Sequence, residues 1–186
     1  MIDQTWDEKY GQESDVSKGP SLLLKQQIHK LPRGMALDLA MGTGRNAIFL
    51  AENGYIVDGI DSSEVAVEKV SSFAQRESLP IHAKHADLTN YRIPENTYDV
   101  ILNFYFLERS LFPQIMKGLK QGGMLLFETY TIEQPKYGRP HNPDYLLRPN
   151  QLLQSFMDLH IIYYHERIDK QTGGTKAIAS LLAQKR

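Results

Sequence analysis

One stretch in the first third of the chain, residues 35–62, limits the fold more than any other part of the sequence. It contains an apolar run, a glycine turn, a helical segment closed by Gly54 and a second apolar run. In order, these segments are Ala36–Ala40, Gly42-Thr43-Gly44, Arg45–Asn53 and Tyr55–Ile60. The order predicts a strand, a tight loop, a helix and a second strand, which together form one βαβ unit.

Two carboxylates mark one end of this unit. Asp38 lies within the first strand near its end, and Asp61 ends the second strand, nineteen residues after Gly42. Glycines at positions 42 and 44 let the backbone pass close to a ligand, because they carry no Cβ atom. A carboxylate at the position of Asp61 can accept hydrogen bonds from both hydroxyls of a ribose. The unit therefore predicts a site for a cofactor that contains a nucleoside.

Two cofactor classes fit this loop. Residues 42–47, GTGRNA, satisfy the dinucleotide pattern G-x-G-x-x-G/A, which keeps an NAD(P)-dependent oxidoreductase as an alternative. A dinucleotide, however, brings an anionic pyrophosphate close to the Asp38 carboxylate, and the two repel each other. S-adenosylmethionine (SAM) has an ammonium group, a sulfonium group and a ribose for Asp61. The charge pattern therefore favours SAM, although Asp38 and Asp61 each also fit a purely structural role.

The rest of the chain continues to alternate strand and helix patterns through residue 129, which predicts a parallel sheet with helices on both faces. We expect a single domain over residues 1–186, because no repeat, linker or low-complexity tract interrupts the sequence. Gly122-Gly123 is expected to separate a helix from the strand that follows it. The further predicted helices are Pro20–Leu31, a segment after Ser62, Leu111–Leu119 and Asn150–Phe156, and the further strands are Ile81–Ala86, Tyr98–Phe104 and Met124–Thr129.

Three segments lie outside this alternation. Trp6 and Tyr10 share one face of a short helix within residues 1–19, which either docks through these rings or covers the cofactor as a lid. Residues 130–149 hold four of the nine prolines, and we expect a substrate loop there, because long loops in compact domains are usually functional. The runs Leu159–Arg167 and Ala177–Leu182, on either side of Gly173-Gly174, predict a hairpin added to the sheet edge.

Composition argues against several classes of function. The net charge is −1 with acids and bases interspersed, so we expect no nucleic-acid partner. No apolar run reaches the roughly 18–20 residues of a membrane span, and the acidic, polar start resembles neither a signal nor a transit peptide, so we expect a cytoplasmic protein. The chain has no cysteine, and its six histidines lack the spacing of a metal site, so we expect no bound metal.

Over nearly its whole length the chain resembles a class I SAM-dependent methyltransferase. The resemblance rests on the motif DLAMGTGRN, from Asp38 to Asn46, together with Asp61 and Asp87 in their expected order. Ala40 departs from the family pattern, which often has glycine at this position. The resemblance implies an α/β fold with a Rossmann-like, seven-stranded, mostly parallel sheet of order 3-2-1-4-5-7-6, in which strand seven is antiparallel.

A closer similarity is to the small bacterial methyltransferases of the tellurite-resistance type. It rests on GRNA after the glycine loop, on the Trp6-Asp7…Tyr10 start and on GRPHNPDYLLRP, from Gly138 to Pro149.

The family resemblance also implies a cofactor site. It implies SAM as the methyl donor and S-adenosylhomocysteine (SAH) as the product. It places Asp61 on the ribose, Asp87 on the adenine amino group, and Asn103 with Phe104 beside the methionine part and the methyl group. The implied cofactor-binding residues are Tyr10, Asp38, Ala40, Gly42, Gly44, Arg45, Asn46, Asp61, Ser62, Asp87, Leu88, Asn103 and Phe104.

The sequence after the fourth strand favours a small-molecule acceptor. Residues 103–106, NFYF, do not match the Asn-Pro-Pro-Tyr type of enzymes that methylate amino groups of nucleic acids or glutamine. Without cysteine, methylation at carbon 5 of cytosine lacks its covalent thiol adduct. Soft acceptors such as sulfur, selenium or tellurium anions need little base catalysis and are therefore an expected class. A non-catalytic SAM-binding protein also fits, because no catalytic base is evident, and so do both a monomer and a homodimer.

Candidate residues for the acceptor side follow strands four and five or lie in the long loop, where open α/β sheets bind ligands. We expect catalytic roles for Tyr105 and Glu128. Each candidate also has a structural interpretation, such as packing of Tyr105 against the sheet. The expected substrate-binding residues are Arg109, Tyr130, Arg139 and His141.

Overall fold

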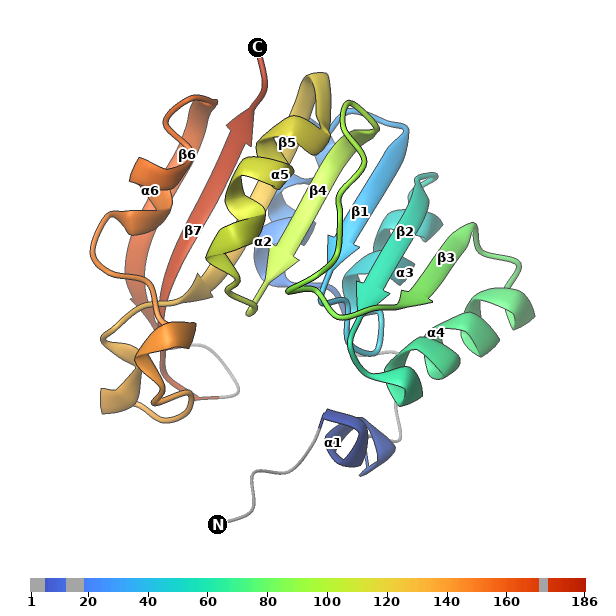
Figure 1. The fold of residues 1–186 in the computed structure, drawn as a ribbon, viewed down its shortest axis with the longest axis horizontal. Coiled ribbons are helices and arrows are strands. Elements are labelled where there is room, and N and C mark those ends of the chain that lie inside the picture. Colours follow the sequence, from blue (N-terminus) through green and yellow to red (C-terminus); the bar gives the residue numbers. More distant parts are fainter. Residues whose placement is uncertain (1–5, 13–18, 171–173) are drawn as a thin grey trace.

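The computed structural model describes residues 6–12, 19–170 and 174–186, and a seven-stranded sheet lies at its centre (Figure 1). The strand order is β3-β2-β1-β4-β5-β7-β6, and β7 is antiparallel to both of its neighbours. This confirms the expected fold class. The strands are β1 Met35–Leu39, β2 Ile56–Asp61, β3 Ile81–His85, β4 Tyr98–Phe104, β5 Leu119–Tyr130, β6 His160–Asp169 and β7 Lys176–Gln184.

The central strands are mostly apolar because both faces of the sheet are covered. Four residues of β1 and six of the seven in β4 are buried. Parallel strands buried on both sides take this composition instead of a polar–apolar alternation. The register pairs Asp38 of β1 with Gly59 of β2 and with Leu102 of β4, so the Asp38 carboxylate belongs to the middle of the sheet.

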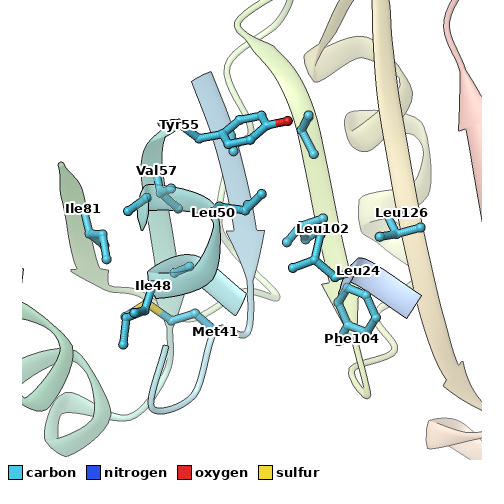
Figure 2. Close-up of a cluster of buried hydrophobic side chains, with 14 of the residues drawn as sticks. Leu24, Met41, Ile48, Leu50, Tyr55, Val57, Ile81, Leu102, Phe104 and Leu126 are labelled. Carbon is cyan, nitrogen blue, oxygen red and sulfur yellow. The ribbon is translucent and has the colours of Figure 1, made fainter. Parts of the chain in front are cut away.

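Helices cover both faces, as expected from the alternating pattern. The helices are α1 Trp6–Gln12, α2 Leu22–Gln27, α3 Arg45–Glu52, α4 Glu64–Arg76, α5 Phe112–Gly118 and α6 Gln151–Ser155. One core joins α2, α3 and α4 to one face of the sheet, and Figure 2 shows Leu24, Ile48 and Leu50 of this core beside strand residues such as Val57 and Leu102. A second core joins α5 and α6 to the other face. Among the described residues, no helix is long and apolar enough to cross a membrane.

Some element bounds differ from the expected ones for local reasons. The helix expected from Pro20 begins at Leu22 and continues as a 3-10 turn, Ile28–Lys30, after which Leu31 is extended. Leu31 precedes Pro32, and a residue before proline is disfavoured in helical conformation. Gly122-Gly123 was expected outside a strand, but β5 runs through it, because Gly122 and Gly123 exchange hydrogen bonds with Lys185.

The long segment after β5 is folded back on itself. Its two ends meet where Ile132 N–H donates to Leu147 O and Leu147 N–H donates to Tyr130 O. Two 3-10 turns, Gln134–Lys136 and Pro143–Tyr145, lie between these ends, and a further 3-10 turn, Arg109–Leu111, precedes α5. The β6–β7 hairpin then completes the sheet, as expected, although Gly173 lies outside the described residues.

Candidate functional site

A cavity of about 320 Å³ lies at the carboxyl ends of the parallel strands, and α1 borders it. Its volume is at the lower end of the range for small-molecule sites, about 300–1,000 Å³. Figure 1 shows α1 beneath this edge of the sheet, separated from it in sequence but adjacent in space. The lining residues are Trp6, Lys9, Tyr10, Ala40, Met41, Gly42, Thr43, Arg45, Asn46, Asp61, Ser62, Leu88, Phe104, Tyr105, Phe106, Tyr130 and Lys176.

The glycine loop borders the cavity and contains three residues with positive φ. Ala40, Gly42 and Gly44 have φ angles of 54°, 55° and 79°. A Cβ atom on Gly42 would lie 2.9 Å from the Tyr10 hydroxyl, and one on Gly44 would lie 2.7 Å from a Val70 methyl carbon. The two glycines are therefore required by both conformation and close approach, whereas Ala40 adopts the left-handed region as a non-glycine residue.

Asp61 links the second strand to the glycine loop at the cavity wall. One carboxylate oxygen accepts a hydrogen bond from Gly42 N–H at 2.7 Å, and the other accepts from Ser63 N–H at 2.9 Å. Burial raises the pKa of Asp61, while the hydrogen bonds from Ser63 and Gly42 act in the opposite direction. Each oxygen has a further lone pair, so this carboxylate can hold the loop and accept hydrogen bonds from a ligand.

Asp38 lies behind the loop and does not line the cavity. Burial raises the pKa of its carboxyl group to about 7, against the opposing effect of the positive charge of Arg45. Its Oδ2 atom is buried and accepts no hydrogen bond from the described residues. A buried acceptor without a donor is uncommon in proteins. Together with the close approach at Gly42, it fits a ligand that brings positive charge to this loop, as SAM does.

Tyr105 lines the cavity and is hydrogen-bonded to Glu128. The Tyr105 hydroxyl donates to Glu128 Oε1 at 3.0 Å, and Ser180 Oγ donates to Glu128 Oε2 at 2.7 Å. Arg167 Nη2 lies 3.3 Å from the same Oε2 atom. Burial, followed by the charge of Glu128, raises the pKa of Tyr105, so its phenol stays protonated. Glu128 does not line the cavity and acts on it through Tyr105.

Most of the implied cofactor residues border the cavity, including Tyr10, Arg45, Asn46, Ser62, Leu88 and Phe104. Asp87, Asn103 and Gly44 are not among the lining residues. Asp87 is exposed and accepts hydrogen bonds from Thr89 and Asn90, which lower its pKa. Asn103 is buried and donates to the Phe106 carbonyl, so it shapes the turn that follows β4.

The residues expected to bind substrate are only partly brought together. Tyr130 lines the cavity, and its ring centroid lies 5.1 Å from that of Tyr105. Arg109 instead donates to the carbonyls of Asp144 and Leu146 and braces the 130–149 segment. Arg139 and His141 are exposed and lie outside the lining, so within that segment only Tyr130 reaches the cavity.

Several lining residues had no site signal in the sequence. Lys176 begins β7, and its ammonium lies 4.7 Å from the Tyr105 ring centroid. Lys9 lies one residue before Tyr10, and its ammonium is 4.4 Å from the Trp6 ring centroid. Met41 and Thr43 lie within the motif, Met41 before its first glycine and Thr43 between the two, and neither had a predicted role. Among the described residues, no group of three or more His, Cys, Asp or Glu side chains could hold a metal ion.

Comparison with known proteins shows the family to which the chain belongs. The family described as tellurite resistance protein TehB matches residues 8–172. The chain belongs to this family. A relative named probable S-adenosyl-L-methionine-dependent methyltransferase TehB, from Haemophilus influenzae, is 28% identical over 140 residues, which are 71% of this chain and 48% of that protein. A protein named hemagglutinin 1, from Eikenella corrodens, is 28% identical over 155 residues, which are 78% of this chain and 50% of that protein.

The chain thus spans about half the length of these two relatives. The crystal structure of TehB from Haemophilus influenzae matches with a TM-score of 0.79 at 20% identity, over 98% of this chain and 68% of that one. At this identity the match shows the fold, which is the Rossmann-like fold of the class I methyltransferases.

Proposed function

We propose that the chain is a SAM-dependent methyltransferase that acts on a small-molecule acceptor, and specifically on a soft sulfur, selenium or tellurium nucleophile. The observation that carries the proposal is the Asp61 carboxylate, held at the cavity wall by Gly42 N–H at 2.7 Å. This is the position from which a carboxylate accepts ribose hydroxyls. Membership of the TehB family and the printed name of the Haemophilus relative support the same activity.

The residues around the glycine loop divide the binding of SAM among them. Asp61 would accept hydrogen bonds from the ribose, and Leu88 would pack against the adenine with Asp87 beside it. The buried Asp38 carboxylate would stabilise positive charge near the loop, and Phe104 would border the methyl group. When bound, SAM supplies a methyl group on a positively charged sulfur. The acceptor lone pair forms the new bond to the methyl carbon, while the electron pair of the breaking carbon–sulfur bond stays on sulfur.

The protein contributes positioning and the exclusion of water more than proton transfer. The Tyr105 proton is committed to Glu128, and the raised pKa of Tyr105 disfavours its use as a base near neutral pH. A soft anion needs no proton removed before it attacks, which supports this acceptor class. Tyr105 therefore acts in the proposal as a wall of the acceptor site, and Glu128 positions it.

The first helix is proposed to cover the bound cofactor. Trp6, Lys9 and Tyr10 line the cavity, while the Ser63 hydroxyl donates to Asp7 and Lys69 donates to the Tyr10 carbonyl. These contacts hold α1 beside the opening, and the three lining side chains support the lid over the alternative of simple docking.

A methyl-transfer assay tests the activity. The protein is incubated with SAM and with thiols, selenite, tellurite and a thiopurine, each assayed separately for SAH formation. We expect transfer to at least one soft acceptor, and an Asp61→Ala variant is expected to lose most of it. Cofactor binding with no transfer to any of these acceptors would instead favour a non-catalytic SAM-binding protein. A cytoplasmic location, the absence of a nucleic-acid partner and a monomeric or homodimeric state remain predictions.

A further inference from the structure

The charges that line the cavity are unequal on its two sides. The sheet order places β2, with Asp61, on one side of β1, and places β4, β5 and β7 on the other. Within the described part of the chain, Asp61 is the one carboxylate of the lining, against three cations, Lys9, Arg45 and Lys176. Asp61 belongs to the cofactor side, so the side formed by β4, β5 and β7 has a cation and no carboxylate facing the cavity.

Lys176 is the cation that the strands of that second side contribute, and Arg45, at the start of α3, also lies over the Tyr105 ring, 5.7 Å from its centroid. Lys176 begins β7, lines the cavity and lies over the Tyr105 ring, which in turn packs against Tyr130. Among the described residues, the structure gives its ammonium no ion pair and no hydrogen bond. A lysine ammonium has three N–H donors, and the contact with the Tyr105 ring leaves them able to donate hydrogen bonds to a ligand.

Two carboxylates on other strands of this part of the sheet, Glu128 of β5 and Asp169 of β6, pair with Arg167. Glu128 accepts from Tyr105 and Ser180 and lies 3.3 Å from Arg167. Asp169, the cross-strand neighbour of Lys176, lies 3.7 Å from the same Arg167 guanidinium. Both carboxylates therefore form ion pairs with Arg167. The Lys176 ammonium lies over the Tyr105 ring, which packs against Tyr130.

We propose that Lys176 is a specificity-determining residue that binds a negatively charged group of the methyl acceptor. The acceptor is thus a small anion, either an inorganic oxyanion or an organic acid with a planar body that packs against Tyr105 and Tyr130. This inference rests on the proposed function and names the charge and position of its acceptor. The positive charge of the methyl donor adds to that of the three lining cations, so an anionic acceptor is also favoured by the charge balance of the filled cavity.

Binding measurements test the role of Lys176 separately from turnover. Calorimetry measures the affinity of 2-mercaptobenzoate, its neutral methyl ester and sodium selenite, with and without saturating SAH. The acid and selenite represent the organic and inorganic sources of the anion. We expect at least one of them to bind the wild-type protein and the ester to bind about 10–100-fold more weakly than the acid, the range expected for one hydrogen bond to a charged group.

Three variants separate a bound charge from simple packing. Lys176→Met keeps the stem that covers Tyr105 but removes the ammonium, and should weaken the anion about 10–100-fold with little effect on the ester. Lys176→Arg should restore most of the affinity. Lys170→Met, at an exposed lysine of the same hairpin, should change nothing. Equal affinity for acid and ester, no anion binding at all, or an unchanged affinity in Lys176→Met would each overturn the proposal.

The SAH titration keeps the two proposals apart. Failure of SAH to bind counts against the proposed function, whereas the titrations without SAH still test whether Lys176 holds an anion. A melting temperature for Lys176→Met close to that of the wild type establishes that the variant is folded.

Discussion

At the scale of single residues, Asp38 is a carboxyl group whose burial is costly to the fold. Its pKa is raised from the ordinary value of 3.8 to about 7, chiefly by burial. The native state therefore binds a proton more tightly than the unfolded chain does. The resulting stabilisation is present below about pH 4 and is lost as the pH rises through 7.

Replacing Asp38 by asparagine should remove this pH-dependent loss. At pH 8 we expect Asp38→Asn to be more stable than the wild type by roughly 4 kcal/mol in the absence of ligand. The advantage should disappear at about pH 3, where the wild-type carboxyl is largely protonated in both states. Urea unfolding at the two pH values measures the difference, and Asp158→Asn, at an exposed acid, serves as the control. An advantage independent of pH would refute the explanation by burial.

Ala40 carries a second residue-scale constraint, because it occupies the left-handed region with φ of 54°. That conformation costs an alanine roughly 1–2 kcal/mol. Glycine removes this cost. It also loses the packing of one methyl group and makes the unfolded chain more flexible, and these two effects together lower the stability by about 1–2 kcal/mol. We therefore expect Ala40→Gly to stay within about 1 kcal/mol of the wild type.

The matched control for this change is Ala36→Gly. Ala36 is a buried alanine of the same region, whereas Ala40 is half-buried, and Ala36 lies in β1 with extended backbone. Glycine has no strain to relieve there, so we expect a loss of about 1–2 kcal/mol. Denaturant unfolding compares the pair. If both variants lose the same stability, the backbone of Ala40 is not strained.

At the scale of elements, α1 is expected to matter for ligand binding more than for folding. Trp6 is 55% exposed, and α1 is held to α4 by few polar contacts. Tyr10→Ala should weaken SAH binding about 3–10-fold, as expected for the loss of one aromatic contact, with a nearly unchanged melting temperature. Tyr137→Ala, at an exposed tyrosine of the 130–149 segment, is the control. Unchanged SAH affinity in Tyr10→Ala would rule out the lid.

The elements that could be predicted from the sequence are those whose bounds depend on neighbouring residues. β4 was predicted with its observed bounds, Tyr98–Phe104, because its apolar run is buried on both faces. The glycine loop and Asp61 were also predicted, because a strand end, a glycine pair and a carboxylate lie close together in the chain. The course of β5 through Gly122-Gly123 was missed, because it depends on pairing with the distant Lys185.

The acceptor side could be predicted only in part, because it depends on tertiary contacts. Arg109 was expected to bind substrate, yet the carbonyls that it meets come from Asp144 and Leu146, and no local pattern places them there. Lys176 was missed, since its approach to Tyr105 follows from the pairing of β7 with β5. From the sequence alone, a lysine beside the glycines of a hairpin is predicted to be an ordinary exposed residue.

At the scale of the whole molecule, the sheet order makes one cavity from two halves of the chain. The first half supplies the glycine loop and Asp61, and the second half supplies Tyr105, Tyr130 and Lys176. A ligand that bridges both halves should stabilise the molecule as a whole, because it binds only the folded state. We propose that this ligand is SAM, held through the ribose by Asp61.

Calorimetric titration of the protein with SAM, SAH and NADH tests that claim most directly. We expect SAM and SAH to bind with a stoichiometry near one and NADH not to bind. Asp61→Asn should weaken both by about 10-fold or more, because it removes a charged acceptor from the ribose hydroxyls. Binding of NADH with no binding of SAM or SAH would show that the cofactor is not SAM. Full affinity for SAM and SAH in Asp61→Asn would show that Asp61 does not hold the ribose.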